Sequence, residues 1–263
     1  MGADLTSDLA LITLSAPGVA LGRRLAQALG PAGLYAHRDV AAPGWEPFDR
    51  VAALSGELFG SCRRLVYIMP TGVVVRALAG CPQHKLTDPA VVVLDVKGRW
   101  AISLLSGHEG GANALAHACA AAICAEPIVT TSTQALKDLV VGVGCRRGAS
   151  AASIREAVTR ALADCGGSLD RVRLLASVDL KRDEPVLLAA AAELDLPLRF
   201  LASEELRRLR LDRPESAVAR RHLDLPGVAE PAAMLAGRRT RLLQPRITWN
   251  GVTAAVAQEE DPS

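Results

Sequence analysis

Short apolar runs alternate along the first half of the chain with segments in which apolar residues recur every three or four positions. The runs at residues 9–14, 63–69, 100–105 and 127–133 predict β-strands, whereas periodic segments such as 19–29 and 112–125 predict amphipathic helices. Strands that alternate with helices are typical of a mainly parallel sheet covered on both faces. The pattern therefore predicts an α/β fold.

The same alternation starts again after a polar connector at residues 134–138. Apolar runs at 139–145, 172–177 and 196–201 predict three further strands with helices between them. A complete series of strands and helices is enough to form its own core. We therefore expect two domains, residues 1–137 and 138–263, each built from a mainly parallel or mixed sheet flanked by helices.

Two turn signals predict hairpins. Lys97 and Gly98 separate the apolar run at 91–95 from the strand that follows it, so these two strands are expected to pair. Asn250 and Gly251 separate two apolar runs near the end of the chain, and Asn-Gly favours a type I′ turn because both residues tolerate positive φ. Both domains are thus expected to contain an antiparallel pair.

The second half contains one predicted helix cap and one predicted exposed loop. The helix after the strand at 139–145 is expected to be capped by Ser150 or by Ser153, and Ser153 with Glu156 matches a capping box. Residues 214–225 are rich in Arg and Asp and are expected to form an exposed loop.

A glycine-rich loop, residues 106–111, joins the strand at 100–105 to the helix that follows. The first N–H groups of a helix lack intrahelical partners and carry the positive end of the helix dipole, so anions bind there. Gly107, Gly110 and Gly111 leave no Cβ between these N–H groups and a ligand. The alternative is that the loop is an ordinary strand-to-helix turn that needs glycine for its backbone geometry alone.

A similar junction occurs upstream, where Thr71 and Gly72 follow the strand at 63–69 and a helix is expected to carry Arg76 in its first turn. In a parallel sheet the carboxyl ends of the strands share one edge, where ligands bind. We therefore expect this junction, the glycine-rich loop and the segment at 130–133 to lie together and to bind one anionic ligand.

His108 and Glu109 supply candidate acid–base chemistry at the glycine-rich loop. An imidazole beside a carboxylate could act as a general base, and nearby glycine amides could stabilise an oxyanion, a combination that suits hydrolysis of an activated ester. A histidine can also serve only to hydrogen-bond backbone in a tight turn. Asp88 is a further candidate base, although Asp before Pro89 is also common turn chemistry.

Cys145 follows a strand and precedes two arginines, conditions that lower the pKa of a thiol, but a structural role is the alternative. The candidate catalytic residues are His108, Glu109 and Asp88. The candidate substrate-binding residues are Thr71, Gly72, Arg76, Lys85, Ser106, Gly107, Gly110, Gly111, Asn113, Cys145, Arg146, Arg147, Asp179, Lys181 and Glu184.

Composition narrows the classes of partner. The net charge of +2 is too small to predict binding to nucleic acid or to an anionic membrane, and aromatic residues make up only 3% of the chain. The six cysteines form no CxxC pair and no zinc-type spacing, so no metal site is predicted. Asp4 and Asp8 occupy the region where a signal peptide needs positive charge, and no apolar run is long enough for a membrane span. We expect a reduced cytoplasmic protein.

Specific segments resemble a known family. RRLVYIMPTGVVVRALAG, HKLTDPAVVVLDVKGRWAISLLSGHEGGANALAHACA and PIVTTST are similar to the N-terminal part of the cobalt-precorrin-5A hydrolase family, CbiG. LVVGVGCRRGASAASI and VRLLASVDLKRDEPVLLAAAAELDLPLRF resemble its C-terminal domain, which also occurs alone as CobE-type cobalamin-biosynthesis proteins.

The resemblance implies a role in corrin-ring synthesis: hydrolytic opening of the ring-A δ-lactone of cobalt-precorrin-5A, with loss of a two-carbon fragment as acetaldehyde. The implied partners are the corrinoid intermediate and other enzymes of the pathway, and no cofactor is implied because any cobalt belongs to the substrate. The substrate's acetate and propionate arms would need cationic sites, which Arg76, Lys85, Arg146 and Arg147 could supply.

One departure from the family is that a middle segment is missing, since Thr133 is followed almost at once by Leu139. If that segment helps to enclose the substrate, the chain could bind a corrinoid without hydrolysing it. The alternative function is therefore a non-catalytic corrinoid carrier or pathway accessory of the CobE type. Nucleotide binding is a weaker alternative, because neither a P-loop nor GxGxxG occurs in the required context.

Overall fold

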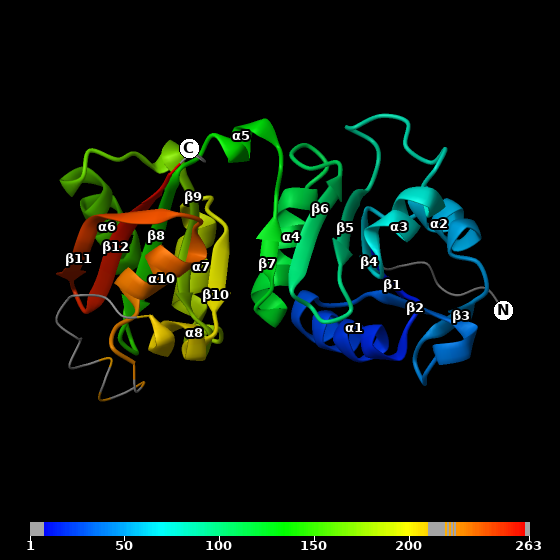
Figure 1. The fold of residues 1–263 in the computed structure, drawn as a ribbon, viewed down its shortest axis with the longest axis horizontal. Helices are drawn as coiled ribbons and strands as arrows, with labels where there is room; N and C mark the ends of the chain where they lie inside the picture. Colours follow the sequence, from blue (N-terminus) through cyan, green and yellow to red (C-terminus); the bar gives the residue numbers. More distant parts are fainter. Residues whose placement is uncertain (1–7, 210–218, 220, 222, 224, 261–263) are drawn as a thin grey trace. The chain divides into compact units, whose positions relative to one another are not determined.

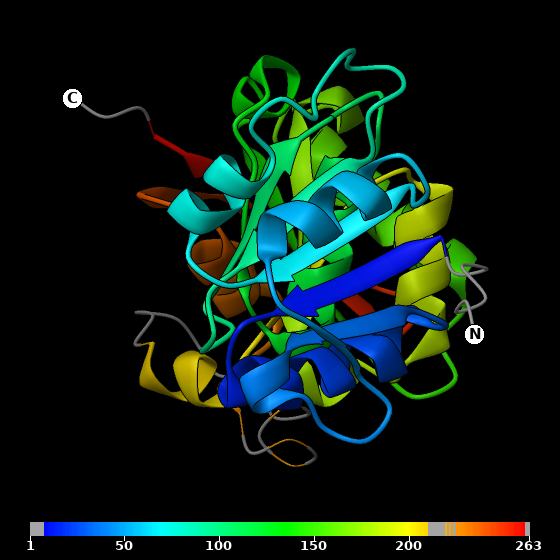
Figure 2. The ribbon, with the colours of Figure 1, turned by 90° about the vertical axis from the view of Figure 1, so that its right-hand side faces the viewer.

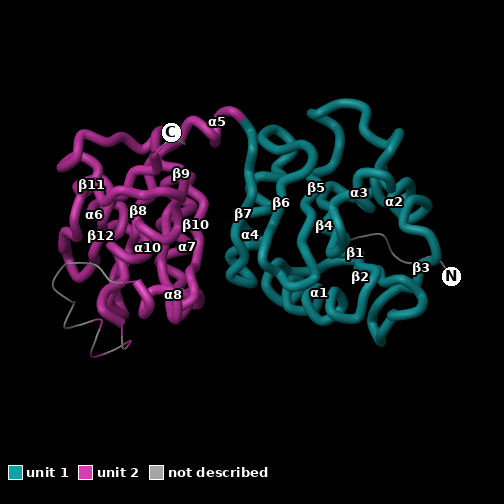
Figure 3. Tube along the Cα trace, viewed as in Figure 1, with its two compact units in different colours: residues 1–131 teal, residues 132–263 magenta. Residues whose placement is uncertain are grey.

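The computed structural model describes residues 8–209, 219, 221, 223 and 225–260, and it divides into two compact units, Met1–Thr131 and Ser132–Ser263 (Figure 3). Each unit is a sheet with helices on its faces (Figure 1). The α/β class and the two flanked sheets expected from the sequence are thereby confirmed. The domain boundary between residues 137 and 138 stays a prediction, close to the division that the contacts give.

The first unit contains a seven-stranded sheet in the order β3-β2-β1-β4-β5-β6-β7. Its strands are β1 (Leu9–Thr13), β2 (Gly33–His37), β3 (Glu46–Phe48), β4 (Arg64–Ile68), β5 (Ala90–Leu94), β6 (Trp100–Leu105) and β7 (Glu126–Ile128). Strands β1 to β5 are parallel, as Figure 2 shows for β1 and β4, whereas β6 runs antiparallel to β5 and β7 runs parallel to β6. The hairpin expected around Lys97 and Gly98 is confirmed.

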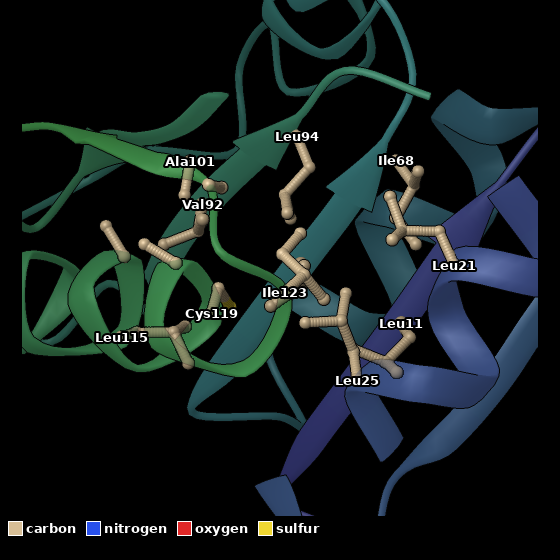
Figure 4. Packing of buried hydrophobic residues seen from close by; sticks show 14 of the residues in the cluster. Leu11, Leu21, Leu25, Ile68, Val92, Leu94, Ala101, Leu115, Cys119 and Ile123 are labelled. Carbon is tan, nitrogen blue, oxygen red and sulfur yellow. The ribbon is translucent and has the colours of Figure 1, made fainter. Parts of the chain in front are cut away.

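Helices cover both faces of this sheet because its strands are apolar on both sides. The helices are α1 (Ala16–Leu29), α2 (Val51–Phe59), α3 (Thr71–Ala77) and α4 (Ala112–Ile123), with a 3₁₀ turn at Arg38–Val40. Leu11 points to the face that α1 and α4 cover, where it packs in one cluster with Leu25 and Ile123 (Figure 4). Ile12, the next residue, packs in the cluster of α2 and α3 on the other face.

The second unit contains a five-stranded sheet in the order β10-β9-β8-β12-β11. Its strands are β8 (Leu139–Cys145), β9 (Val172–Val178), β10 (Leu198–Leu201), β11 (Thr240–Trp249) and β12 (Val252–Glu259). Strands β8, β9 and β10 are parallel, and β12 joins β8 and β11 in antiparallel pairs. The final hairpin is confirmed, with φ of 47° at Asn250 and 78° at Gly251, as a type I′ turn requires.

The helices of the second unit are α5 (Ser132–Ala135), α6 (Ala151–Asp164), α7 (Pro185–Glu193), α8 (Ser203–Arg208) and α10 (Ala229–Ala236), with 3₁₀ turns at Leu169–Arg171 and Asp179–Lys181. Helix α10 lies so close to β8 that a Cβ at Gly142 would fall 1.9 Å from the Ala229 carbonyl oxygen. Glycine at this position therefore allows the helix to approach the strand.

Three local predictions were wrong. The segment at 127–133 is not one strand, because β7 ends at Ile128 and Ser132 begins α5. Arg76 lies in the last turn of α3, since the helix begins at Thr71. Ser150 caps α6 by accepting from the Ser153 N–H at 3.1 Å, so Ser153 with Glu156 is not a capping box. The loop expected at 214–225 lies largely outside the described residues.

In the part of the chain that the structure describes, no helix has both the length and the apolar character needed to span a bilayer. The six cysteines all lie among the described residues and form no disulfide with one another.

Candidate functional site

The edge of the first sheet where β5 begins and β6 ends brings two predicted segments together. We call it the hairpin edge, and it follows from the antiparallel register, in which Val91 pairs with Leu105. The loop before β5 carries Lys85, and the loop after β6 carries Glu109. Lys85 Nζ lies 2.9 Å from Glu109 Oε1, so an ion pair joins the two loops.

The glycine-rich loop at the hairpin edge is closed at its base by two backbone hydrogen bonds. The Ala112 N–H donates to the Ser106 carbonyl at 3.1 Å, and the Asn113 N–H donates to the Gly107 carbonyl at 2.9 Å. Within the described residues, no backbone acceptor is recorded for the N–H groups of residues 107–111. These N–H groups, at the start of α4, form a concentrated set of hydrogen-bond donors.

Asn113 fixes this loop to its neighbours. Its Oδ1 accepts from Ser103 Oγ at 2.8 Å, and its Nδ2 donates to Thr131 Oγ1 at 3.0 Å. A Cβ at Gly107 would fall 2.7 Å from Thr131 Cγ2, so the loop packs directly on the segment after β7. Asn113 is only 7% exposed, and its contacts suit a positioning role better than direct substrate binding.

Ser103 was missed by the sequence analysis, although it is a polar residue inside an apolar strand. The segment at 130–133 was expected near the glycine-rich loop, and the Thr131 hydroxyl does lie there.

His108 and Glu109 are both exposed at the tip of the loop. The hydrogen bond from Lys85 is the main cause that lowers the pKa of the Glu109 carboxyl, and nearby His108 lowers it further. Glu109 is therefore ionised at neutral pH and stands close enough to the imidazole to interact with it.

Asp88 also lies in the loop before β5, but its carboxylate braces that loop. Its two oxygens accept from the Gln83 N–H at 3.1 Å and 3.0 Å. The turn alternative thus has direct geometric support, and Asp88 is a weaker candidate base than His108.

Thr71, Gly72 and Arg76 do not join the hairpin edge. They follow β4, whose end pairs with the end of β5 through Ile68 and Leu94, so their junction begins at the opposite edge of the sheet. The expected convergence of two helix starts is wrong because β6 runs against β5 and carries its loop to the other edge. Arg76 Nη1 instead donates to the Gly72 carbonyl at 3.0 Å.

In the second unit, the predicted residues gather where β8, β9 and β10 end, which we call the parallel edge. The β8–β9 register, with Gly142 opposite Ala176, places Cys145 beside Asp179. Asp179 Oδ1 accepts from the Ser203 N–H at 3.1 Å and so ties the end of β9 to the start of α8.

Lys181 is the most buried charged residue predicted for either site. The residue is 7% exposed, and its Nζ lies 3.1 Å from Glu184 Oε1. An ammonium and a carboxylate in such a tight pair are joined by a charge-assisted hydrogen bond. The parallel edge therefore contains a fixed, water-poor ion pair next to Cys145.

The Cys145 thiol does not have the lowered pKa that its neighbours in the sequence suggest. Burial raises its pKa, and the nearby charge of Lys181 offsets this only in part. The thiol is thus protonated at neutral pH, which favours the structural alternative. The side chains of Arg146 and Arg147 are exposed, and a Cβ at Gly251 would fall 2.3 Å from Arg146 Nε, so Gly251 leaves room for the Arg146 guanidinium.

Among the described residues, no group of three or more His, Cys, Asp and Glu side chains is arranged to hold a metal ion. The donors at the hairpin edge are backbone amides, an imidazole and an ion pair, a set suited to carboxylate or ester chemistry.

Two family models match the chain in succession. The model described as Cobalamin synthesis G N-terminal matches residues 53–134, and the model described as Cobalamin synthesis G C-terminus matches residues 139–257. The two matches end and begin on either side of the predicted domain boundary.

Curated relatives have related names. The chain is 26% identical over 356 aligned residues to a cobalt-precorrin-5A hydrolase of Priestia megaterium, covering 95% of this chain and 94% of the relative. It is 42% identical over 127 residues to the cobalt-precorrin-5A hydrolase of Salmonella typhimurium, covering 48% of this chain and 36% of the relative. It is 38% identical over 129 residues to Protein CobE of Sinorhizobium sp, covering 48% of this chain and 83% of the relative.

Among solved structures, the crystal structure of CobE, a protein from the cobalamin biosynthetic pathway, is 36% identical and matches 48% of this chain and 92% of its own, with a TM-score of 0.44. Cobalamin biosynthesis protein chiG from Agrobacterium tumefaciens is 34% identical and matches 47% of this chain and 99% of its own, with a TM-score of 0.37.

Proposed function

We propose that this chain, which belongs to the CbiG family of cobalamin-synthesis proteins, is a hydrolase that acts on cobalt-precorrin-5A. The reaction is hydrolytic opening of the ring-A δ-lactone, followed by release of acetaldehyde. The observation that carries the proposal is the hairpin edge, where the Lys85–Glu109 ion pair holds the His108 loop beside the backbone N–H groups that precede α4.

Each part of this edge has a chemical role. His108 takes a proton as an oxygen nucleophile attacks the lactone carbonyl, and the ionised Glu109 stabilises the imidazolium that forms. The N–H groups of the glycine-rich loop donate to the oxyanion that develops on the carbonyl oxygen.

Each unit, taken by itself, has exposed cations that suit the carboxylate arms of a corrinoid. Lys85 at the hairpin edge, with 70% of its side chain exposed, and Arg146 and Arg147 at the parallel edge can pair with the carboxylate arms of a corrinoid. Cobalt enters as part of the substrate, and the chemistry needs no cofactor.

A corrinoid carrier without catalytic activity is the second candidate. It is favoured by the match of the C-terminal half to Protein CobE, which this chain covers over 83% of that protein's length. It is also favoured by the 356 positions of the Priestia megaterium alignment, which exceed the 263 residues of this chain and leave residues of that hydrolase without a counterpart.

Acetaldehyde release separates the two functions. The purified chain is incubated with cobalt-precorrin-5A, acetaldehyde is measured with alcohol dehydrogenase and NADH, and corrinoid binding is followed by its absorption spectrum. A hydrolase releases acetaldehyde in proportion to the lactone consumed. A spectral shift on binding with no acetaldehyde would instead support the carrier.

A further inference from the structure

Ser106 combines three features that are costly for a residue with only a structural role. Its φ is 59°, in the left-handed region that side chains other than glycine rarely adopt. The residue is 8% exposed, and its Oγ is buried with no hydrogen-bond partner among the described residues. Strained backbone and unpaired buried polar groups both reduce stability.

A folding requirement alone would favour glycine at this position. The loop already contains glycines, and a Cβ at Gly110 would fall 2.3 Å from Ser106 Cβ, so the loop is built closely around the serine. Glycine at 106 would adopt the same φ without strain and would remove the unpaired hydroxyl. Strain at one residue within a candidate site is therefore a sign of chemical use.

The chain geometry around Ser106 is that of a strand, a sharp turn and a helix. Strand β6 ends at Leu105, Ser106 follows directly, and α4 begins at Ala112 with the loop donors between them. Some hydrolases place a nucleophilic serine on a strained strand-to-helix turn, with the N–H of the next residue, here Gly107, in the oxyanion hole.

We propose that Ser106 is the nucleophile that opens the lactone, an inference that rests on the proposed hydrolase function. Ser106 Oγ adds to the lactone carbonyl carbon while its proton passes to His108. The bond between that carbon and the ring oxygen then breaks, the ring oxygen takes the proton, and the substrate becomes an ester of Ser106. Water attacks this ester, which yields the substrate carboxyl group and restores the serine hydroxyl.

The hydroxyl is covered in this conformation, so the lactone reaches it only when the loop moves aside. Gly107, Gly110 and Gly111 give the loop the backbone freedom for that movement, and Gly111 already has a φ of 86°. The Asn113 contacts hold the base of the loop while its tip moves.

Two variants and a matched control test the role. Ser106→Ala and Ser106→Gly are expected to lower kcat by about a thousandfold or more. Ser106→Gly is also expected to raise the melting temperature, because it removes both the strain and the buried hydroxyl. Cys124→Gly relieves a φ of 58° at the other end of α4 and should leave turnover unchanged. Turnover of Ser106→Gly at the parent rate overturns the proposal.

A covalent readout separates this inference from the proposed function. After mixing with cobalt-precorrin-5A and acid quenching, the parent peptide that contains Ser106 should gain the mass of the whole lactone, because lactone opening expels no fragment. If acetaldehyde has already been released, the gain should be smaller by the mass of acetaldehyde. A fluorophosphonate probe should label the same residue with loss of fluoride.

The outcomes differ for the two proposals. Acetaldehyde release from the parent with full activity in Ser106→Gly refutes the nucleophile and keeps the hydrolase. Labelling of Ser106 by the fluorophosphonate without acetaldehyde release keeps the nucleophile and refutes the substrate. Absence of both signals refutes both.

Discussion

The two units place their candidate residues at sheet edges of different kinds. In the first unit β6 runs against β5, so the glycine-rich loop lies where β5 begins and away from Thr71 and Gly72. In the second unit β8, β9 and β10 run in one direction, so Cys145 and Asp179 lie side by side. Residues that follow parallel strands meet at one edge, whereas a single antiparallel hairpin divides them between two edges.

The ion pairs at the two edges also differ in solvent exposure. At the hairpin edge, the side chains of Lys85 and Glu109 are 70% and 40% exposed, whereas those of Lys181 and Glu184 are 9% and 23% exposed. An exposed pair is screened and contributes little to stability, but removal of one partner from a buried pair leaves an uncompensated charge. We infer that the hairpin edge can move during a reaction and that the parallel edge is a fixed surface.

Among the variants that compare the two edges, replacing His108 should have the largest effect on activity. His108→Gln keeps a polar side chain but removes the base, so kcat should fall by about 10²–10⁴-fold. The melting temperature should change little, since His108 is exposed. Acetaldehyde release and thermal unfolding measure the two quantities.

The control for this variant is His37→Gln, at the end of β2 and away from the hairpin edge, which should keep parent turnover. If activity loss in His108→Gln tracks loss of folded protein, His108 is structural and the catalytic role of the hairpin edge is lost with it.

Replacing the lysine of each ion pair should distinguish the two edges by the loss in unfolding free energy. Lys181→Met leaves the Glu184 carboxylate without its partner and should cost about 2–4 kcal/mol of unfolding free energy. Lys85→Met, the matched change at the exposed pair, should cost much less, because solvent screens that pair. Urea denaturation gives both values.

The double variant Lys181→Met with Glu184→Leu should recover part of the loss, because no unpaired charge remains. Equal losses for the two single lysine variants would show that burial does not distinguish the edges.

The sequence predicted the elements better than their directions. The apolar runs located the strands, and Lys97-Gly98 and Asn250-Gly251 located both hairpins, because these signals are local. The expected meeting of Thr71 with the glycine-rich loop is wrong, because the hairpin that the sequence does predict reverses β6 and carries its loop to the other edge of the sheet.

Other site features depend on contacts that the sequence does not contain. The raised pKa of Cys145 comes from its burial, which outweighs nearby positive charge. The Asp88 carboxylate is occupied by the Gln83 N–H, a contact that any Asp-Pro turn allows but none guarantees. The strain at Ser106 depends on how the loop closes onto α4.

Acidification should weaken the second unit through Asp138. Hydrogen bonds from Arg171 are the main cause that lowers the pKa of the Asp138 carboxyl; burial opposes them, and Gln258 adds to them. The folded-state pKa lies below the unfolded value, so the stabilisation is present above about pH 4 and is lost as the pH falls through the folded-state pKa.

Asp138→Asn should therefore cost about 1 kcal/mol at neutral pH, because the pair is partly exposed, and less as the pH falls. Urea denaturation of parent and variant between about pH 3 and pH 7 tests this dependence. A difference that stays constant across this range would exclude the ionised carboxylate as its cause.

The smallest expected effect concerns the exposed arginines and tests whether the parallel edge binds substrate. Arg146→Ala should weaken binding of cobyrinic acid, a stable corrinoid with carboxylate arms, by about 0.5–1 kcal/mol, since the guanidinium is exposed and well screened. Arg76→Ala should change binding less, because Arg76 Nη1 donates to the Gly72 carbonyl and its junction begins away from the hairpin edge.

Titration by absorption at low and high salt measures both arginine variants, and the Arg146 effect should shrink as salt screens it. Equal weakening by the two substitutions would mean that general positive charge, and not the parallel edge, attracts the corrinoid. A larger loss from Arg76→Ala would instead place the substrate at the edge of the first sheet where β4 and β5 end. A substrate that binds there and also reaches the hairpin edge would have to span the first sheet.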